Sequence, residues 1–126
     1  EKAFLESYKA SDNKVFFVGR VGGNIVSTAT LTGRGRNRMR HVAELGSGVG
    51  QSHWGAGVGR KMMEHLLEWA QKEGILKRIQ LVVREDNARA IALYESLGFS
   101  LEARLQRETY LDGRYFDSFQ YVLLWD

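Results

Sequence analysis

The sequence predicts a single domain of the α/β (α+β) class, with a central mixed, mostly antiparallel sheet and flanking helices. β-rich runs dominate both ends of the chain, and turn residues at Gly22–Gly23 and Asp112–Gly113 separate neighbouring runs as in hairpins. Between these ends, two segments with helical periodicity surround one further β-rich run. The 126 residues contain no proline, repeat or linker-like stretch, so residues 1–126 are expected to form one domain.

Composition narrows the possible functions. Hydrophobic residues make up 44% of the chain and charged residues 26%, as in ordinary globular proteins. The absence of cysteine excludes disulfides and a thiolate nucleophile, and the three histidines lack the HExxH spacing, so no metal is expected. No apolar run reaches the roughly 18 residues of a membrane span, and we expect a cytoplasmic protein. The net charge of +3 fits an anionic ligand.

The first half of the chain is predicted to contain one helix and three strands. The segment Glu1–Ala10 is predicted to be helical because Phe4, Leu5 and Tyr8 recur at helical spacing. It does not open on methionine, so we expect an upstream segment to be missing. Three β-rich runs follow: Lys14–Val21, Asn24–Leu31 and His41–Val49. The connection between the last two has no apolar period and carries four arginines: Arg34, Arg36, Arg38 and Arg40.

The second half is predicted to contain two helices and three strands. The first helix begins near Val58 and ends at Gly74, because apolar residues recur at steps of three and four: Val58, Met62, Met63, Leu66, Leu67 and Ala70. The second helix spans about Ala88–Leu97 and closes at Gly98. The strands are Arg78–Val83, Ser100–Tyr110 and Tyr115–Leu124.

A glycine-rich segment lies between the third strand and the following helix, with Gly55, Gly57 and Gly59 at alternate positions. The first turn of a helix leaves backbone N–H groups without partners, so a pyrophosphate can bind there if side chains leave room. Arg60 and Lys61 can add contacts to phosphate oxygens. The P-loop pattern GxxxxGK[ST] and the dinucleotide pattern GxGxxG both fail here. A purely structural turn is the alternative.

A second candidate group lies on the helix after the next strand, in the run NARAIALYESLGF. Asn87, Ile91 and Tyr94 fall near one face of that helix at steps of four and three. An amide and a phenol can therefore face the same groove. The structural alternative makes Asn87 a helix cap and Tyr94 a core residue.

The two motifs together resemble the GNAT N-acetyltransferase superfamily, over roughly Lys14 to the C-terminus. WGAGVG resembles the family's loop pattern [QR]xxGx[GA], with Trp54 in place of Gln or Arg, and NxxAxxLYxxLGF follows one strand later. The ending RETYLDGRYFDSFQYVLL is similar to the C-terminal hairpin of ribosomal-protein, polyamine and amino-acid acetyltransferases. The resemblance implies acetyl transfer from acetyl-CoA to a primary amine, and an N-terminal strand and helix missing from this chain.

The resemblance also implies a site. In this family the strands before the loop and after its helix splay apart at the acyl-CoA site, which here implies a wedge between His41–Val49 and Arg78–Val83. Val49 would supply backbone contacts and Asn87 a pantetheine contact, in a gap whose backbone donors also suit a developing oxyanion. The pyrophosphate cradle would comprise Trp54, Gly55, Ala56, Gly57, Val58, Gly59 and Arg60.

Two side chains are candidates for proton transfer. Tyr94 is the candidate acid that protonates the departing thiolate, and the alternative is that it only hydrogen-bonds the sulfur. Glu44 is the candidate base for the incoming amine, directly or through water. The alternative makes Glu44 an ion-paired surface residue, and His41 and His53 are other candidate bases.

The same residues are compatible with other functions. A catalytically silent acyl-CoA-binding regulatory module is the main alternative, and the presence of both Asn87 and Tyr94 argues against it. The four arginines lack the interleaved aromatic residues of a nucleic-acid surface, and would favour a carboxylate-bearing amine if they lined the acceptor pocket. The expected partners are a small-molecule amine or a peptide N-terminus, without nucleic acid or membrane, and with a homodimer as one option.

Overall fold

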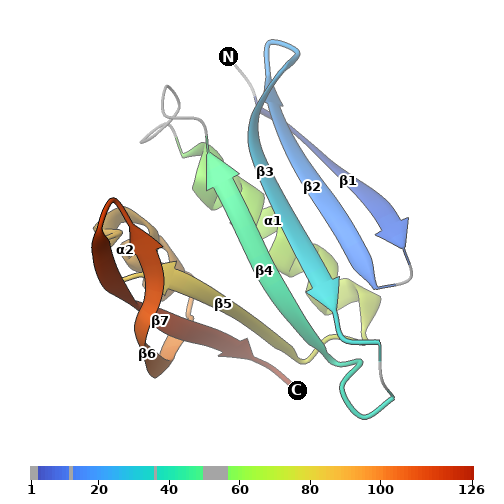
Figure 1. Ribbon diagram of the computed structural model, residues 1–126. Coiled ribbons are helices and arrows are strands. Elements are labelled where there is room, and N and C mark those ends of the chain that lie inside the picture. Colours follow the sequence, from blue (N-terminus) through green and yellow to red (C-terminus); the bar gives the residue numbers. More distant parts are fainter. Residues whose placement is uncertain (1–2, 12, 36, 50–56) are drawn as a thin grey trace. The chain divides into compact units, whose positions relative to one another are not determined.

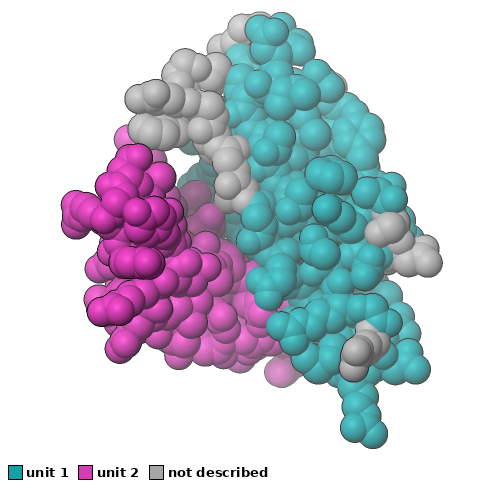
Figure 2. All heavy atoms as spheres, viewed as in Figure 1, with its two compact units in different colours: residues 1–77 teal, residues 78–126 magenta. Residues whose placement is uncertain are grey.

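The chain forms seven strands and two helices in a computed structural model that describes residues 3–11, 13–35, 37–49 and 57–126 (Figure 1). It divides into two compact units, residues 1–77 and 78–126 (Figure 2). The predicted α+β class is confirmed, and the strand pairs described within each unit are antiparallel. The predicted splay involves one strand of each unit, so it stays a prediction, as does the single-domain organisation.

The first unit contains a four-stranded meander and one helix (Figure 1). Its strands are β1 (Ala3–Ser11), β2 (Lys14–Val21), β3 (Asn24–Gly33) and β4 (Val42–Val49), each paired with the next along the chain. The last three agree with the predicted runs to within two residues at each end. Side chains alternate across the sheet, so that one face is buried under the helix and the other is open.

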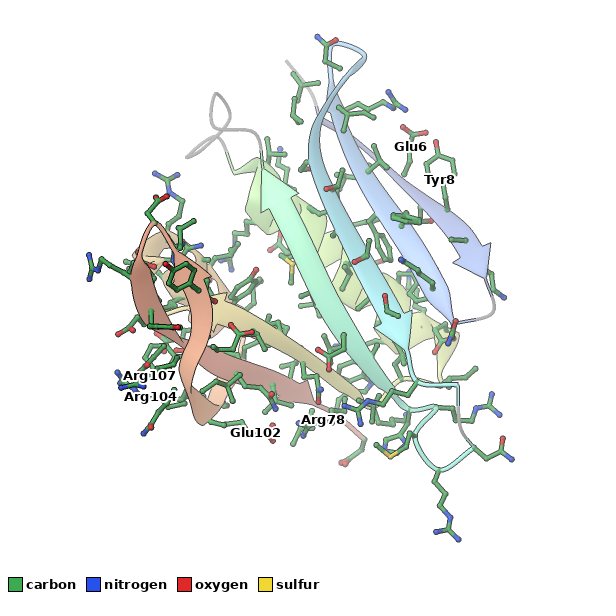
Figure 3. The ribbon with its side chains drawn as sticks, viewed as in Figure 1. Glu6, Tyr8, Arg78, Glu102, Arg104 and Arg107 are labelled. Atoms are coloured by element: carbon green, nitrogen blue, oxygen red, sulfur yellow. The ribbon has the colours of Figure 1, made fainter. Side chains whose placement is uncertain are left out.

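The helix predicted at the start of the chain is wrong, because this segment is strand β1. It pairs with β2 over its length, with Leu5 opposite Gly19 and Tyr8 opposite Phe16. In a strand Leu5 and Tyr8 point to opposite faces, whereas the helical interpretation grouped them on one. A cross-strand polar contact also favours the strand, because Glu6 accepts a hydrogen bond from the Nε of Arg20 of β2 at 2.6 Å. Tyr8, on the same face of β1, also donates to Glu6 (Figure 3).

Helix α1 (Val58–Glu73) confirms the periodicity analysis. Its buried residues are the six predicted apolar ones: Val58, Met62, Met63, Leu66, Leu67 and Ala70. Phe17 of β2 is fully buried against this helix, with its ring 5.9 Å from that of His65 and 5.7 Å from that of Trp69. The helix ends at Gly74 in the left-handed region, at φ 85°, which glycine adopts without a steric penalty.

The second unit contains three strands and one helix. In it β7 (Arg114–Leu124) is the central strand, paired with β5 (Arg78–Arg84) and with β6 (Ser100–Leu111). Helix α2 (Ala88–Ser96) connects β5 to β6. These bounds agree with the predicted elements to within one residue. On the sheet, Arg78 donates to Glu102 from both terminal nitrogens, at 2.9 and 2.5 Å, which ties β5 to the outer strand β6 (Figure 3).

In the described part of the chain, no helix has the length and apolar character needed to cross a membrane.

Candidate functional site

The start of α1 has the features of an anion-binding helix terminus. Gly57 occupies the N-cap position at φ 78° and ψ 4°, and no side chain caps the first turn. The first turn contains no acidic residue, and a Cβ built at Gly57 would meet no atom of the described residues within 4 Å, its chain neighbours aside. The first backbone N–H groups of the helix have no intrahelical partner, and the partial positive charge of the helix start favours an anion.

Arg60 and Lys61 follow on the exposed side of the same turn. The Nε of Arg60 lies 3.5 Å from a carboxylate oxygen of Glu64, one turn further along, and both side chains are about half exposed. A loose, solvated pair of this kind contributes little to stability, so Arg60 can exchange partners at small cost. The predicted cradle residues Trp54, Gly55 and Ala56, and the candidate base His53, lie outside the described residues.

Strand β4 places Glu44 on the open face of the first unit's sheet. Its neighbours Ala43 and Leu45 are buried, and Glu44 itself is exposed opposite Thr32 of β3. A carboxylate oxygen of Glu44 lies 3.7 Å from the Nη2 of Arg34, with the two side chains 47% and 44% exposed. The ion-pair interpretation thus describes this structure, while the role of Glu44 as a base stays a prediction. Val49 ends the same strand, opposite Ser27.

Asn87 and Tyr94 lie two turns apart at the two ends of α2. Asn87 is the N-cap, and its side-chain oxygen accepts a hydrogen bond from the backbone N–H of Ala90 at 3.2 Å. Tyr94 is buried, with 8% of its surface exposed, and its ring packs at 5.8 Å from that of Phe99. Both structural alternatives are therefore realised here. Neither contact prevents the amide N–H₂ or the phenol hydroxyl from also meeting a ligand, and those roles stay predictions.

A carboxylate that the sequence analysis missed anchors the connection leading to Asn87. The backbone N–H of Asp117 donates to the carboxylate of Glu85 at 2.6 Å, and the N–H of Glu85 donates to the carbonyl of Asp117 at 3.0 Å. The Asp117 carboxylate in turn accepts from the N–H of Arg107 at 2.9 Å and the Nε of Arg104 at 2.8 Å (Figure 3). Both donors lower the pKa of Asp117 below its ordinary value, and the N–H of Arg107 has the larger effect.

An irregularity in β6 between Leu105 and Thr109 explains why this cluster was missed. Counting back from the Asp112–Gly113 turn pairs Arg104 with Tyr121, whereas the observed partner of Arg104 is Phe119. The register shifts between Leu105 and Thr109, where Arg107 adopts φ 53°. A bulge changes which side chains face each other, and no turn residue in the sequence marks its position.

The described residues bring together no group of three His, Asp or Glu side chains that could hold a metal ion. His65 lies on α1 beside Phe17, and the backbone carbonyl of His41 accepts from the N–H of Lys77 at 2.9 Å.

A sequence profile of the acetyltransferase (GNAT) family matches residues 1–99. The chain belongs to this family. The resemblance drawn from the glycine loop and the NxxAxxLYxxLGF run is thereby confirmed.

Individual GNAT relatives cover parts of the chain. The L-amino acid N-acetyltransferase AaaT of Escherichia coli is 30% identical over 102 residues, which are 81% of this chain and 63% of that protein. The ribosomal protein bS18-alanine N-acetyltransferase of Escherichia coli is 50% identical over 60 residues, which are 46% of this chain and 39% of that enzyme. The chain thus spans less than two thirds of the length of either relative.

Solved structures of the family share the fold. A GNAT-family acetyltransferase from Streptococcus pneumoniae superposes with a TM-score of 0.87 at 34% identity, over 91% of this chain and 69% of that one. The protein yncA from Salmonella typhimurium, solved with its cofactor acetyl-CoA, superposes with a TM-score of 0.82 at 26% identity, over 90% of this chain and 65% of that one.

Proposed function

We propose that this GNAT chain is the acyl-CoA-binding body of an N-acetyltransferase that transfers the acetyl group of acetyl-CoA to a primary amine. The observation that carries the proposal is the start of α1 at Gly57, which has no acid in its first turn and, within the described part of the chain, no atom within 4 Å of a Cβ built on the glycine. Family membership supplies the reaction class. The names of two relatives, which act on L-amino acids and on an alanine of a ribosomal protein, support an amino acid or peptide N-terminus as acceptor.

The chain's own residues have defined tasks in this proposal. The backbone N–H groups of Gly57, Val58 and Gly59 would bind the diphosphate, and Arg60 would add a charged contact. These groups fit an anion because they belong to a helix start whose first turn has no acidic residue. Acetyl-CoA supplies the activated acyl group as a thioester.

The proton transfers fall to two side chains. The amine nitrogen forms a bond to the acyl carbon as the carbon–sulfur bond breaks, so one proton must leave the amine and one must reach the sulfur. Tyr94 would donate to the departing thiolate, and Glu44 would accept from the amine. Burial of Tyr94 against Phe99 restricts its rotamers, which suits a group whose position matters more than its acidity.

The proposal is tested by thiol release from acetyl-CoA with free amino acids, polyamines and peptide N-termini as acceptors. Tyr94→Phe keeps the packing on Phe99 and removes only the hydroxyl, so kcat should fall by roughly a hundredfold while acetyl-CoA affinity stays within about twofold. Tyr121→Phe is the matched control, because Tyr121 is also buried and its hydroxyl donates to Glu95 at 2.9 Å. If Tyr94→Phe turned over as fast as the parent, Tyr94 would not be the acid. If the parent bound acetyl-CoA but released no thiol with any acceptor, the regulatory module would be favoured.

A further inference from the structure

The first unit contains a cavity of about 200 Å³. Its lining residues come from the end of the sheet where β3 connects to β4, and from the end of α1, elements that are labelled in Figure 1. Its floor is apolar and formed by core side chains, each at most 7% exposed: Val15, Leu31, Ala43 and Leu76. Trp69 of α1 forms one wall. A floor of this kind binds an apolar group of a ligand.

The polar lining of the cavity is mainly basic. Arg34 and Arg40 line it from the β3–β4 connection, and Glu73 lines it from the last turn of α1. The Glu73 carboxylate is engaged by the backbone N–H groups of Ile75 and Leu76, at 2.8 and 3.0 Å. Among the lining residues alone, two guanidinium groups face one carboxylate, so the lining carries one positive charge in excess. This excess favours an anionic ligand.

The two arginines differ in their partners. Arg34 lies 3.7 Å from Glu44, so part of its charge is already balanced. Among residues 3–11, 13–35, 37–49 and 57–126, no carboxylate lies within ion-pair distance of Arg40, whose side chain is exposed. Arg40 is therefore the group best able to form a two-pronged contact with an incoming carboxylate.

Hydrogen bonds hold both ends of the connection that carries these arginines. At its start, Asn13 donates to the carbonyl of Gly33 at 3.0 Å, and the N–H of Arg34 donates to the carbonyl of Val42 at 3.1 Å. At its end, the carbonyl of His41 accepts from Lys77 at 2.9 Å. The backbone at Arg34 and next to Arg40 is thus hydrogen-bonded before any ligand binds, which lowers the entropic cost of binding.

The cavity is separate from the proposed diphosphate site. Trp69 follows Gly57 by twelve residues along α1, which corresponds to about 18 Å at 1.5 Å per residue. The two sites lie at opposite ends of one helix, so their ligands would not compete for space.

From the apolar floor, the charge excess and the anchored arginines, we infer that this cavity binds a small organic monocarboxylate. Its carboxylate pairs with Arg40, assisted by Arg34, and its apolar part lies against Leu31 and Trp69. The volume equals the share of roughly seven water molecules at ~30 Å³ each, which suits a single aromatic ring or a short aliphatic chain.

Binding of phenylacetate, compared with the near-isosteric neutral phenylacetamide, tests this inference on the whole chain without acetyl-CoA. Phenylacetate should bind about tenfold more tightly by calorimetry, the expected value of one charge-assisted hydrogen bond, and should shift the NMR resonances of Gly35 and the Trp69 indole. Arg40→Gln should remove about this tenfold preference. Arg38→Gln is the matched control, because Arg38 lies two residues from Arg40, is exposed and does not line the cavity. The affinity of this variant for phenylacetate should stay within about twofold of that of the parent.

Three results would overturn the inference: equal affinity for acid and amide, equal loss in Arg38→Gln and Arg40→Gln, or NMR shifts confined to Gly57–Lys61. Circular dichroism of both variants verifies that they fold. CoA binding measured in parallel keeps the two proposals apart, because Arg40→Gln should leave CoA affinity unchanged. If phenylacetate did not bind, the acetyltransferase proposal would be unaffected. If CoA did not bind, the proposal of a carboxylate site in the cavity would be unaffected.

Discussion

The side-chain oxygen of Asn87 accepts a hydrogen bond from the backbone N–H of Ala90 at 3.2 Å, so the residue expected to contact pantetheine also begins helix α2. The two tasks use different atoms of one amide. The oxygen is needed for the cap, and the N–H₂ group is available as a donor to a carbonyl. Substitutions that keep one capability and remove the other can therefore separate structure from binding.

Asn87→Ser should retain the cap, because serine is about as good an N-cap residue as asparagine, whereas Asn87→Ala should lower the free energy of unfolding by about 1 kcal/mol. If the amide contacts pantetheine, both variants should bind CoA more weakly than the parent. Urea unfolding and calorimetry measure the two quantities. CoA affinity that is unchanged in Asn87→Ser would restrict this residue to capping.

Gly57 should be sensitive to alanine for two independent reasons. Its left-handed backbone at φ 78° costs about 1–2 kcal/mol for a residue with a Cβ, although that Cβ would touch none of the described residues apart from its chain neighbours. A reoriented helix start should also weaken CoA binding by about tenfold, the loss of one charge-assisted contact.

Gly74→Ala provides the control for this prediction, because Gly74 has φ 85° and is equally open at the other end of α1. It should lose similar stability and keep its CoA affinity. Equal effects of the two variants on CoA binding would place the diphosphate elsewhere.

The elements that sequence analysis predicted correctly are those whose periodicity extends over several turns or pairs. Six apolar positions define α1, and all six are buried. Leu5 and Tyr8 offered too few positions to distinguish a helix from a strand, and pairing with β2 decided the outcome. The glycine spacing marks the start of α1, whose role as a diphosphate site stays a prediction. The Asp117 cluster depends on the register shift between Leu105 and Thr109 of β6. The cavity could not be predicted, because it requires residues from β2 to the end of α1 to come together.

The adjacent residues Phe16 and Phe17 should respond very differently to alanine. Phe17 is fully buried between His65 and Trp69, so Phe17→Ala should lower the free energy of unfolding by about 3–5 kcal/mol. Phe16 points to the open face and is 38% exposed, with the Lys14 ammonium 5.2 Å from its ring. Phe16→Ala should therefore cost less than about 1.5 kcal/mol. Similar losses, measured by urea unfolding, would mean that the register of β2 is wrong.

The pH dependence of stability should reveal the Asp117 cluster. The N–H of Arg107 and the guanidinium of Arg104 lower the pKa of Asp117 from its ordinary 3.8, because both stabilise the carboxylate. A carboxyl group with a lowered folded-state pKa stabilises the fold above pH 3.8, and this contribution disappears as the pH falls through the lower folded value. Asp117→Asn should therefore be less stable than the parent at neutral pH and converge with it in acid.

Asp112→Asn is the control for this experiment, because it removes the same charge from the same hairpin and asparagine tolerates the left-handed backbone at φ 51°. It should differ little from the parent at any pH. Urea unfolding midpoints of the three proteins, followed from about pH 7 to about pH 2, measure the difference. A deficit in Asp117→Asn that persists at the lowest pH would show that the charge of Asp117 is not what stabilises its contacts with Arg104 and Arg107 of β6.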